Sequence, residues 1–307
     1  MKIKSSNEYS KLRSVIVGTA QYANWPTKDL AFREMEETTR WKHSPVPSGA
    51  VDQSIIDHTE EELENLCNVL VSRNVEVYRP SLINYQALDG MYGYCPRDRL
   101  LVIDKDVIDC RMRFICRQME LQTYSMIPDE NIVTIDDESV VFDAANVLRM
   151  NDDLLYLVSD SGNRAGAEWL QKRYPDKKVH VLDNIYQGVH IDSTITVLNE
   201  NTVVLNASRV TGDKLPEIFK DWNIVWINEK DLAPIGFYKY PYASKWMALN
   251  MFSIDRRTVI VDQDQHEIIR KLEKRNFTVI PQKLTHCRTL GGGFHCCTLD
   301  LWREDGN

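Results

Sequence analysis

The sequence lacks several features that would place it in a common class. It has no stretch dense in lysine and arginine, and its formal net charge is −8, so it is not expected to bind duplex nucleic acid, which requires clustered positive charge. No apolar run approaches the roughly 18–20 residues that span a bilayer, and no apolar segment follows the N-terminal lysines as in a signal peptide. We therefore expect a cytoplasmic protein with small-molecule partners and no membrane contact.

The cysteines and glycines also exclude some kinds of site. The 7 cysteines are an odd number, so they cannot all pair, and they form none of the CxxC doublets of a zinc or redox motif. The glycine-rich segment at 291–294 lacks the GxGxxG spacing and the following helix of a dinucleotide-binding loop. Most of the cysteines are expected to be buried thiols.

What the chain does contain is a repeated unit with a period of roughly 50 residues. Each unit begins with two apolar runs separated by a short polar turn, the pattern of a β-hairpin. Stretches with helical spacing follow at 111–124, 165–174, 215–222 and 266–276, and each precedes a further strand-like run. The hairpins are expected at 99–110, 147–159, 195–206 and 250–262.

An N-terminal copy would use a strand at 14–18, a helix at 59–74 and a strand at 75–80. Five ββαβ units would close into a ring without exposed sheet edges. We therefore predict an α/β fold that forms a five-bladed ββαβ propeller with pseudo-fivefold symmetry around a central active-site channel. It would span residues 1–307 as a single domain. A doubly wound sheet is the alternative, but it has single strands where this sequence has hairpins.

Three segments from different units could carry chemistry together. They contain Asp143, then His190 with Asp192, and finally Cys296. Taken singly, each has an ordinary structural explanation, such as a helix cap or a buried thiol. Together they supply a nucleophile, a base and a group that orients the base, which the centre of a ring could bring together.

Seven segments together resemble the amidinotransferase family within the guanidino-group-modifying enzymes. They cover almost the whole chain in the family's order, and the family's fold is a five-bladed ββαβ propeller. The segments are NEYSKLRSVIVG at 7–18, CPRD at 95–98, FDAANVLR at 142–149, NRAGAEWL at 163–170, HIDST at 190–194, ASKW at 243–246 and GGGFHCCTLD at 291–300.

The resemblance implies catalytic roles for three residues. Cys296 would be the nucleophile, His190 the general acid and base, and Asp143 the group that orients His190. The amidino group of L-arginine would move to the cysteine and then to an acceptor amine in a ping-pong cycle. No metal or organic cofactor would be needed.

The resemblance also implies four substrate-binding residues. Asp98 and Asp192 would hold the guanidinium, whose planar N–H groups pair well with carboxylates, while Arg209 and Ser244 would bind the carboxylate of the amino acid. Glycine is the default acceptor, with L-ornithine and guanidinoacetate as products. However, residues 186–189 read Tyr-Gln-Gly-Val where the arginine:glycine enzymes have Asn-Pro-Met, which leaves the acceptor open.

Other functions remain possible at this level. Water as the acceptor would make the protein a guanidino hydrolase that converts arginine to citrulline and ammonia. The acceptor of a transferase could also be an amine other than glycine. A non-catalytic propeller that binds guanidino compounds or a protein is the third alternative. The frequency of symmetric dimers among oligomers favours a homodimer.

Overall fold

The computed structural model describes residues 1–36 and 46–304, and in this part of the chain the strands form five three-stranded sheets and one two-stranded ribbon. The ribbon joins β2 (Asn24–Trp25) to β3 (Gly49–Ala50). Four sheets follow one another along the chain. They are β5 (Leu100–Ile103), β6 (Asp106–Asp109) and β7 (Ile132–Thr134); β8 (Val147–Met150), β9 (Asp153–Leu157) and β10 (Lys178–Leu182); β11 (Ile195–Asn199), β12 (Thr202–Asn206) and β13 (Asn223–Ile227); and β14 (Phe252–Asp255), β15 (Thr258–Asp262) and β16 (Thr278–Gln282).

In each of these four sheets an antiparallel hairpin is extended by a parallel third strand. The predicted hairpins and third strands are therefore confirmed, as is the α/β class. Asp104 and Asn151 occupy the left-handed region at their hairpin turns, with φ of 54° and 65°. Short polar side chains tolerate this backbone conformation, so the two turns form without glycine.

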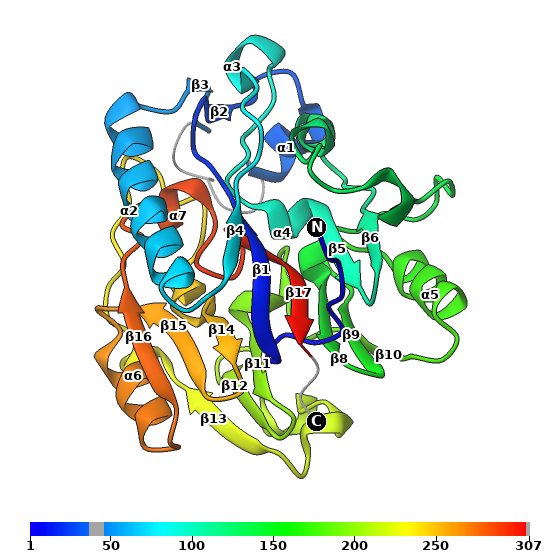
Figure 1. Ribbon diagram of the computed structural model, residues 1–307, viewed down its shortest axis with the longest axis vertical. Helices are drawn as coiled ribbons and strands as arrows, with labels where there is room; N and C mark the ends of the chain where they lie inside the picture. Colours follow the sequence, from blue (N-terminus) through cyan, green and yellow to red (C-terminus); the bar gives the residue numbers. More distant parts are fainter. Residues whose placement is uncertain (37–45, 305–307) are drawn as a thin grey trace.

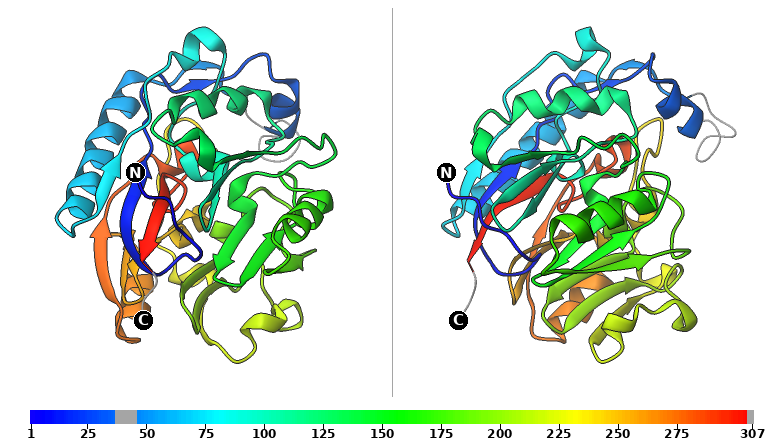
Figure 2. Two further views of the ribbon diagram at one scale, coloured as in Figure 1. Left: turned by 45° about the vertical axis from the view of Figure 1, so that its right-hand side comes forward. Right: turned by 90° about the vertical axis from the view of Figure 1, so that its right-hand side faces the viewer.

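The fifth sheet joins the two ends of the chain. β1 (Lys11–Val17) pairs antiparallel with β17 (Thr298–Glu304) and parallel with β4 (Glu76–Tyr78). Figure 1 shows β1 and β17 side by side, and Figure 2 shows the same pair from two further directions. The sequence predicted β1 and β4 but not the contribution of the C-terminal strand.

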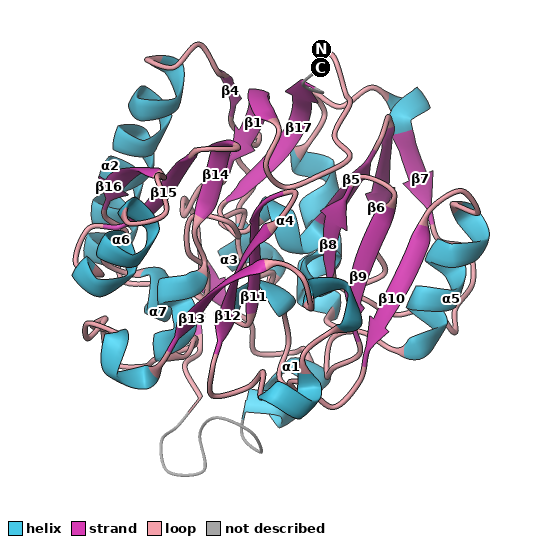
Figure 3. Ribbon diagram, turned by 90° about the horizontal axis from the view of Figure 1, so that it is seen from below, coloured by secondary structure: helices cyan, strands magenta, loops and turns pink. Residues whose placement is uncertain are grey.

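The helices agree with the prediction in three units. α2 (Gln53–Val71), α5 (Arg164–Arg173) and α6 (His266–Glu273) are present, and Figure 3 shows α5 on the opposite side of the molecule from α2 and α6. The helix predicted at 215–222 is wrong, because two short 3₁₀ turns, Gly212–Lys214 and Glu217–Phe219, occupy this region instead. Pro216 has no N–H to donate and disfavours a helical conformation at Leu215, which has a ψ of 119°.

The unit after β6 is also irregular, with a 3₁₀ helix at Ile115–Thr123 in place of an α-helix. The remaining α-helices are short: α1 (Leu30–Met35), α3 (Tyr85–Leu88), α4 (Pro96–Arg99) and α7 (Cys287–Leu290). None of the helices in the described part of the chain is long and apolar enough to cross a membrane.

A short turn precedes the first strand of each repeated hairpin, and these turns position the candidate site. α4 leads into β5, and 3₁₀ turns at Ala144–Asn146, Ile191–Ser193 and Lys245–Leu249 lead into β8, β11 and β14. Residues 294–297 form a turn before β17. α4 contacts the turn before β8, which contacts the turn before β11, which contacts the turn before β14, and α4 also contacts β17.

Candidate active site

Five of the candidate site residues lie on or directly beside four of these turns. Asp98 is part of α4, Asp143 and His190 are the residues just before the turns that lead into β8 and β11, and Asp192 is inside the latter turn. Cys296 lies in the turn at residues 294–297, two positions before β17. Turns of different units therefore supply the thiol, the imidazole and the carboxylates.

His190 lies between two carboxylates. Its Nε2 is 3.0 Å from Oδ2 of Asp143, and its Nδ1 is 3.5 Å from Oδ1 of Asp98. Burial opposes the charged imidazolium, but the negative charge of Asp98 and the hydrogen bond to Asp143 outweigh it and raise the pKa of His190 well above its ordinary value. The imidazolium is therefore favoured in the free site, where it can act as a proton donor.

The Cys296 thiol is almost completely buried, with 1% of its surface exposed. Its Sγ lies 3.1 Å from Oδ2 of Asp192 and 3.0 Å from Nδ2 of Asn250. A hydrogen bond with the Cys95 thiol, together with burial, raises the pKa of Cys296 well above its ordinary value. The negative charge of Asp192 acts in the same direction, whereas a hydrogen bond with His190 opposes it. In the free site the thiol form is therefore favoured.

Three carboxylate oxygens in the site have no hydrogen-bond partner among the described residues. They are Oδ1 of Asp98, Oδ1 of Asp143 and Oδ1 of Asp192, and all three are buried. A buried carboxylate oxygen without a partner is costly. Burial raises the pKa of Asp98, although the positive charges of His190 and Arg117 oppose this shift. The site therefore has unused capacity to accept hydrogen bonds from a cation.

The second oxygens of Asp98 and Asp192, their Oδ2 atoms, already have partners. Arg117 Nη1 donates to Oδ2 of Asp98 over 3.2 Å, and Arg117 is itself paired with Glu120. His295 Nδ1 lies 3.0 Å from Oδ2 of Asp192, and its Nε2 lies 3.3 Å from Glu8. Burial raises the pKa of Glu120 to about 7, against the opposing charge of Arg117.

A cavity of about 310 Å³ opens onto this cluster. Asp98, Asp143, His190, Asp192 and Cys296 all line it, so the structure brings the five carboxylate, imidazole and thiol groups expected from the sequence to one place. The volume is at the lower end of the range for small-molecule pockets. The cavity can therefore admit a substrate to Cys296.

The two residues expected to bind a carboxylate differ in position. Ser244 lines the cavity, whereas Arg209 is not among the described lining residues. The Arg209 guanidinium instead donates to the carbonyl and hydroxyl of Ser193 and lies 3.5 Å from the ring centre of Tyr186. Ser193 and Tyr186 line the cavity, so Arg209 lies one layer behind its wall.

Four residues of the site were not predicted from the sequence. Asn250 contacts the sulfur, while His295, Arg117 and Glu120 support the two carboxylates. His295 precedes Cys296 in GGGFHC, and Asn250 follows ASKW by four positions. Their place within or beside these motifs was the available signal, but their partners are distant in sequence.

Comparison with known proteins identifies relatives along the whole chain. No protein-family model matches the sequence. Inosamine-phosphate amidinotransferase 1 of Streptomyces griseus is 37% identical over an alignment that covers 97% of this chain and 96% of that protein. The mitochondrial glycine amidinotransferase of Xenopus tropicalis is 29% identical over an alignment that covers 98% of this chain and 82% of that protein.

Comparison of the fold with solved structures identifies the same group of proteins. The solved structure of the inosamine-phosphate amidinotransferase of Streptomyces griseus has a TM-score of 0.93 to this chain at 36% identity, and the match covers 99% of this chain and 97% of that one. The predicted transferase activity is thus confirmed, and the protein is an enzyme. The chain belongs to the amidinotransferase family.

Proposed function

We propose that this enzyme transfers the amidino group of L-arginine through Cys296 to an acceptor amine other than glycine, on an aminocyclitol phosphate such as inosamine phosphate. The observation that carries the arginine half of the proposal is the pair of unpartnered oxygens, Oδ1 of Asp98 and Oδ1 of Asp192, in the cavity beside Cys296. A guanidinium is planar, has N–H donors along its edges, and carries a positive charge that would balance the negative charge of these carboxylates.

In the first half of the reaction, arginine binds with its guanidinium between Asp98 and Asp192. The positive charge of the guanidinium compensates the carboxylates that oppose ionisation of Cys296 and that favour the imidazolium form of His190. His190 therefore releases its proton to solvent when arginine binds, and its neutral imidazole takes the proton of the thiol. The thiolate forms a bond to the guanidino carbon. The bond from this carbon to the departing nitrogen then breaks as His190 returns the proton to that nitrogen, and ornithine leaves. Cys296 then carries the amidino group as a cationic adduct.

In the second half, the acceptor amine enters the space that ornithine has left. Its nitrogen attacks the amidino carbon while His190 takes a proton from it, and Asp143 stabilises the imidazolium that forms. The bond from carbon to sulfur breaks, the new guanidino compound leaves, and His190 returns its proton to the sulfur, so Cys296 becomes a thiol again. Protons and charges balance over the cycle without any further reactant.

The acceptor is inferred from the wall of the cavity and from the relatives. The relative with 37% identity is named for inosamine phosphate, whereas the glycine enzyme is 29% identical. Tyr186 and Val189, from the loop that departs from the glycine enzymes, line the cavity. Arg288 also lines it, held by two 2.9 Å hydrogen bonds to the carbonyls of Ala243 and Ile235. A fixed guanidinium suits a phosphate.

An acceptor panel with L-arginine as the donor tests this proposal. Glycine, L-lysine, an inosamine and its phosphate are compared by mass spectrometry of the guanidino product and of ornithine. We expect the phosphorylated inosamine to be the best acceptor, and a chelator to leave the rate unchanged. Guanidinoacetate formed from glycine at an equal or higher rate would contradict the proposed acceptor. Citrulline formed without an acceptor would contradict transfer itself.

The Arg288→Gln variant sharpens the same assay. If Arg288 contacts the phosphate, this change lowers kcat/KM for the phosphorylated inosamine about 10- to 100-fold, the effect of one hydrogen bond to an ionised group. The value for the unphosphorylated inosamine should stay nearly constant. An equal loss with both acceptors would assign Arg288 to support of the loop rather than to the acceptor.

Asp98, His190 and Cys296 also place one donor atom each within 4.8 Å of one another, which is close enough to hold a metal ion. We assign this cluster to the guanidinium, because the reaction needs a free thiolate and a basic imidazole.

We further infer that the chain forms one domain and that its five sheets close into the predicted propeller. The sheet shared by β1 and β17 and the successive contacts of the five turns support this closure. The cytoplasmic location and the homodimer stay predictions.

A further inference from the structure

We propose that Asn250 is a further catalytic residue, whose side-chain N–H donates a hydrogen bond to the sulfur of Cys296 and stabilises its thiolate. The inference rests on the proposed role of Cys296 as the nucleophile. It is carried by the 3.0 Å contact between Asn250 Nδ2 and Cys296 Sγ. Asn250 is 1% exposed, so water does not compete for this contact.

The orientation of the Asn250 amide is fixed by the main chain. Its Oδ1 accepts hydrogen bonds from the backbone N–H groups of His295, over 2.9 Å, and Cys296, over 3.0 Å. The reverse orientation would set an NH₂ group against two N–H donors and an oxygen against the sulfur. The NH₂ group therefore has to face Cys296, where it can only donate.

Close packing holds Asn250 against the turn that carries the nucleophile. The carbonyl oxygen of Asn250 accepts from the N–H of Phe294 over 3.0 Å. A Cβ on Gly293 would lie 2.8 Å from the Cβ of Asn250, so a larger residue at position 293 would push the segments that contain Gly293 and Asn250 apart. This requirement for close approach explains one of the three consecutive glycines.

The chemistry of the sulfur shows why a fixed donor matters. In the free site the thiol donates to Oδ2 of Asp192. Once the guanidinium binds and the thiol proton leaves, an ionised Asp192 can no longer accept from the sulfur and repels it instead. A neutral N–H donor at 3.0 Å favours the thiolate without adding a charge. Asn250 is placed to supply such a donor before and during the attack.

Two substitutions separate this role from simple support of the turn. Asn250→Asp keeps an oxygen for the two backbone N–H groups but replaces the donor with a second oxygen. Asn250→Ala removes both. If the amide only supports the turn, the Asp variant should behave like the wild type and the Ala variant should be impaired. If the amide stabilises the thiolate, the Asp variant should be impaired at least as strongly as the Ala variant.

The measurement is the rate at which iodoacetamide alkylates Cys296 as a function of pH, without substrate, with the label located by mass spectrometry. We expect the rate near pH 8 to fall about 10- to 100-fold in both variants, as expected for the loss of one hydrogen bond to an ionised group, and the pH midpoint to rise. Ornithine release in a single turnover should fall in parallel. An unchanged midpoint in either folded variant would overturn the proposal.

Asn7→Asp is a matched control. Asn7 is also 1% exposed, and its Oδ1 accepts from two backbone N–H groups, those of Tyr9 and Ser10. Its NH₂ group donates to Ser10 and Asn151 rather than to the nucleophile. The control should leave the alkylation midpoint unchanged. Cys296→Ser tests the underlying function separately: if it kept turnover, the nucleophile would be wrong, whatever the Asn250 variants do.

Discussion

Two buried clusters of charge lie next to each other in this enzyme, and they differ in how their charges are paired. In the first, three arginines surround two carboxylates, and every carboxylate oxygen in it has a partner. Arg149, for example, donates to Glu8 over 2.8 Å and to Asp300 over 2.9 Å. We call it the paired cluster, and it comprises Glu8, Arg97, Arg149, Asp300 and Arg303.

The second cluster contains more negative than positive groups. Each of its three aspartates leaves one buried oxygen without a hydrogen-bond partner among the described residues. We call it the open cluster, and it comprises Asp98, Asp143, His190, Asp192 and Cys296. His295 links the two clusters, because its ring contacts Glu8 on one side and Asp192 on the other. From this comparison we expect the paired cluster to stabilise the fold and the open cluster to be completed by a cationic substrate.

Removal of the nucleophile should have the largest effect on the open cluster. We expect Cys296→Ala to lower turnover by about 10⁴-fold or more, because no other group can hold the amidino intermediate. The melting temperature should change far less than turnover, because the variant loses only the hydrogen bonds of one side chain. Cys297→Ala is the control, because Cys297 is the next residue, is equally buried and does not line the cavity. Comparable turnover in the two variants would contradict the assignment.

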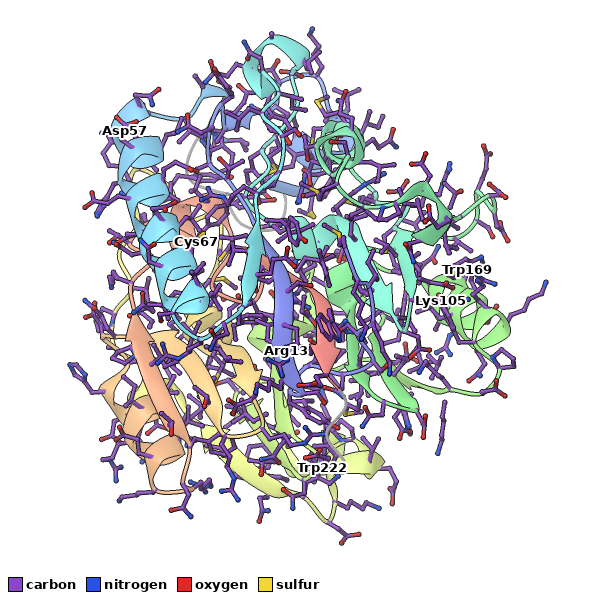
Figure 4. All side chains as sticks on the ribbon, in the orientation of Figure 1. Arg13, Asp57, Cys67, Lys105, Trp169 and Trp222 are labelled. Atoms are coloured by element: carbon purple, nitrogen blue, oxygen red, sulfur yellow. The ribbon has the colours of Figure 1, made fainter. Side chains whose placement is uncertain are left out.

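Breaking the paired cluster should reduce stability instead. Arg149→Met leaves Glu8 and Asp300 buried without their main partner, which costs about 3–5 kcal/mol of unfolding free energy. Urea denaturation measures this loss. Arg13→Met is the control: Arg13, labelled on β1 in Figure 4, pairs with Glu304 at the surface, where a pair contributes about 0–1 kcal/mol. Equal losses of unfolding free energy in the two variants would contradict the description of the paired cluster as buried and fully hydrogen-bonded.

The sequence predicted the order of the strands well because hairpin signals are local. It did not predict that β17 completes the sheet of β1, since Val17 and Thr298 meet only after the intervening chain has folded. The 3₁₀ turns at 212–219 were missed for a local reason, the proline at position 216. The open cluster was predicted through the family's motifs rather than from composition or periodicity. Asn250 was missed, because its importance depends on a contact with a residue 46 positions away.

A substitution that removes one charge from the open cluster should affect substrate binding but not the fold. Asp192→Asn weakens the hold on the guanidinium, so we expect kcat/KM for arginine to fall about 10- to 100-fold. Unfolding free energy should fall less than in Asp300→Asn, because one buried oxygen of Asp192 has no hydrogen-bond partner, whereas both oxygens of Asp300 accept from arginines. Asp300→Asn, the corresponding change in the paired cluster, should lower unfolding free energy. If Asp192→Asn were the more destabilising of the two, the distinction between the clusters would be wrong.

The two clusters should also respond to pH in opposite directions, with a smaller effect. Despite burial, Arg149, Arg97 and Arg303 hold the pKa of Asp300 well below its ordinary value, so its contribution to stability is present above about pH 4 and is lost as pH falls through the folded-state pKa. The pKa of His190 is raised, so its contribution to stability is complete below about pH 6.5 and is lost as pH rises through the folded-state pKa.

The melting temperature should therefore fall at low pH and again at high pH. His190→Gln should flatten only the alkaline decline, because the paired cluster and its arginines remain. If the melting temperature of this variant falls at high pH as much as that of the wild type, groups outside the open cluster cause the loss of stability there.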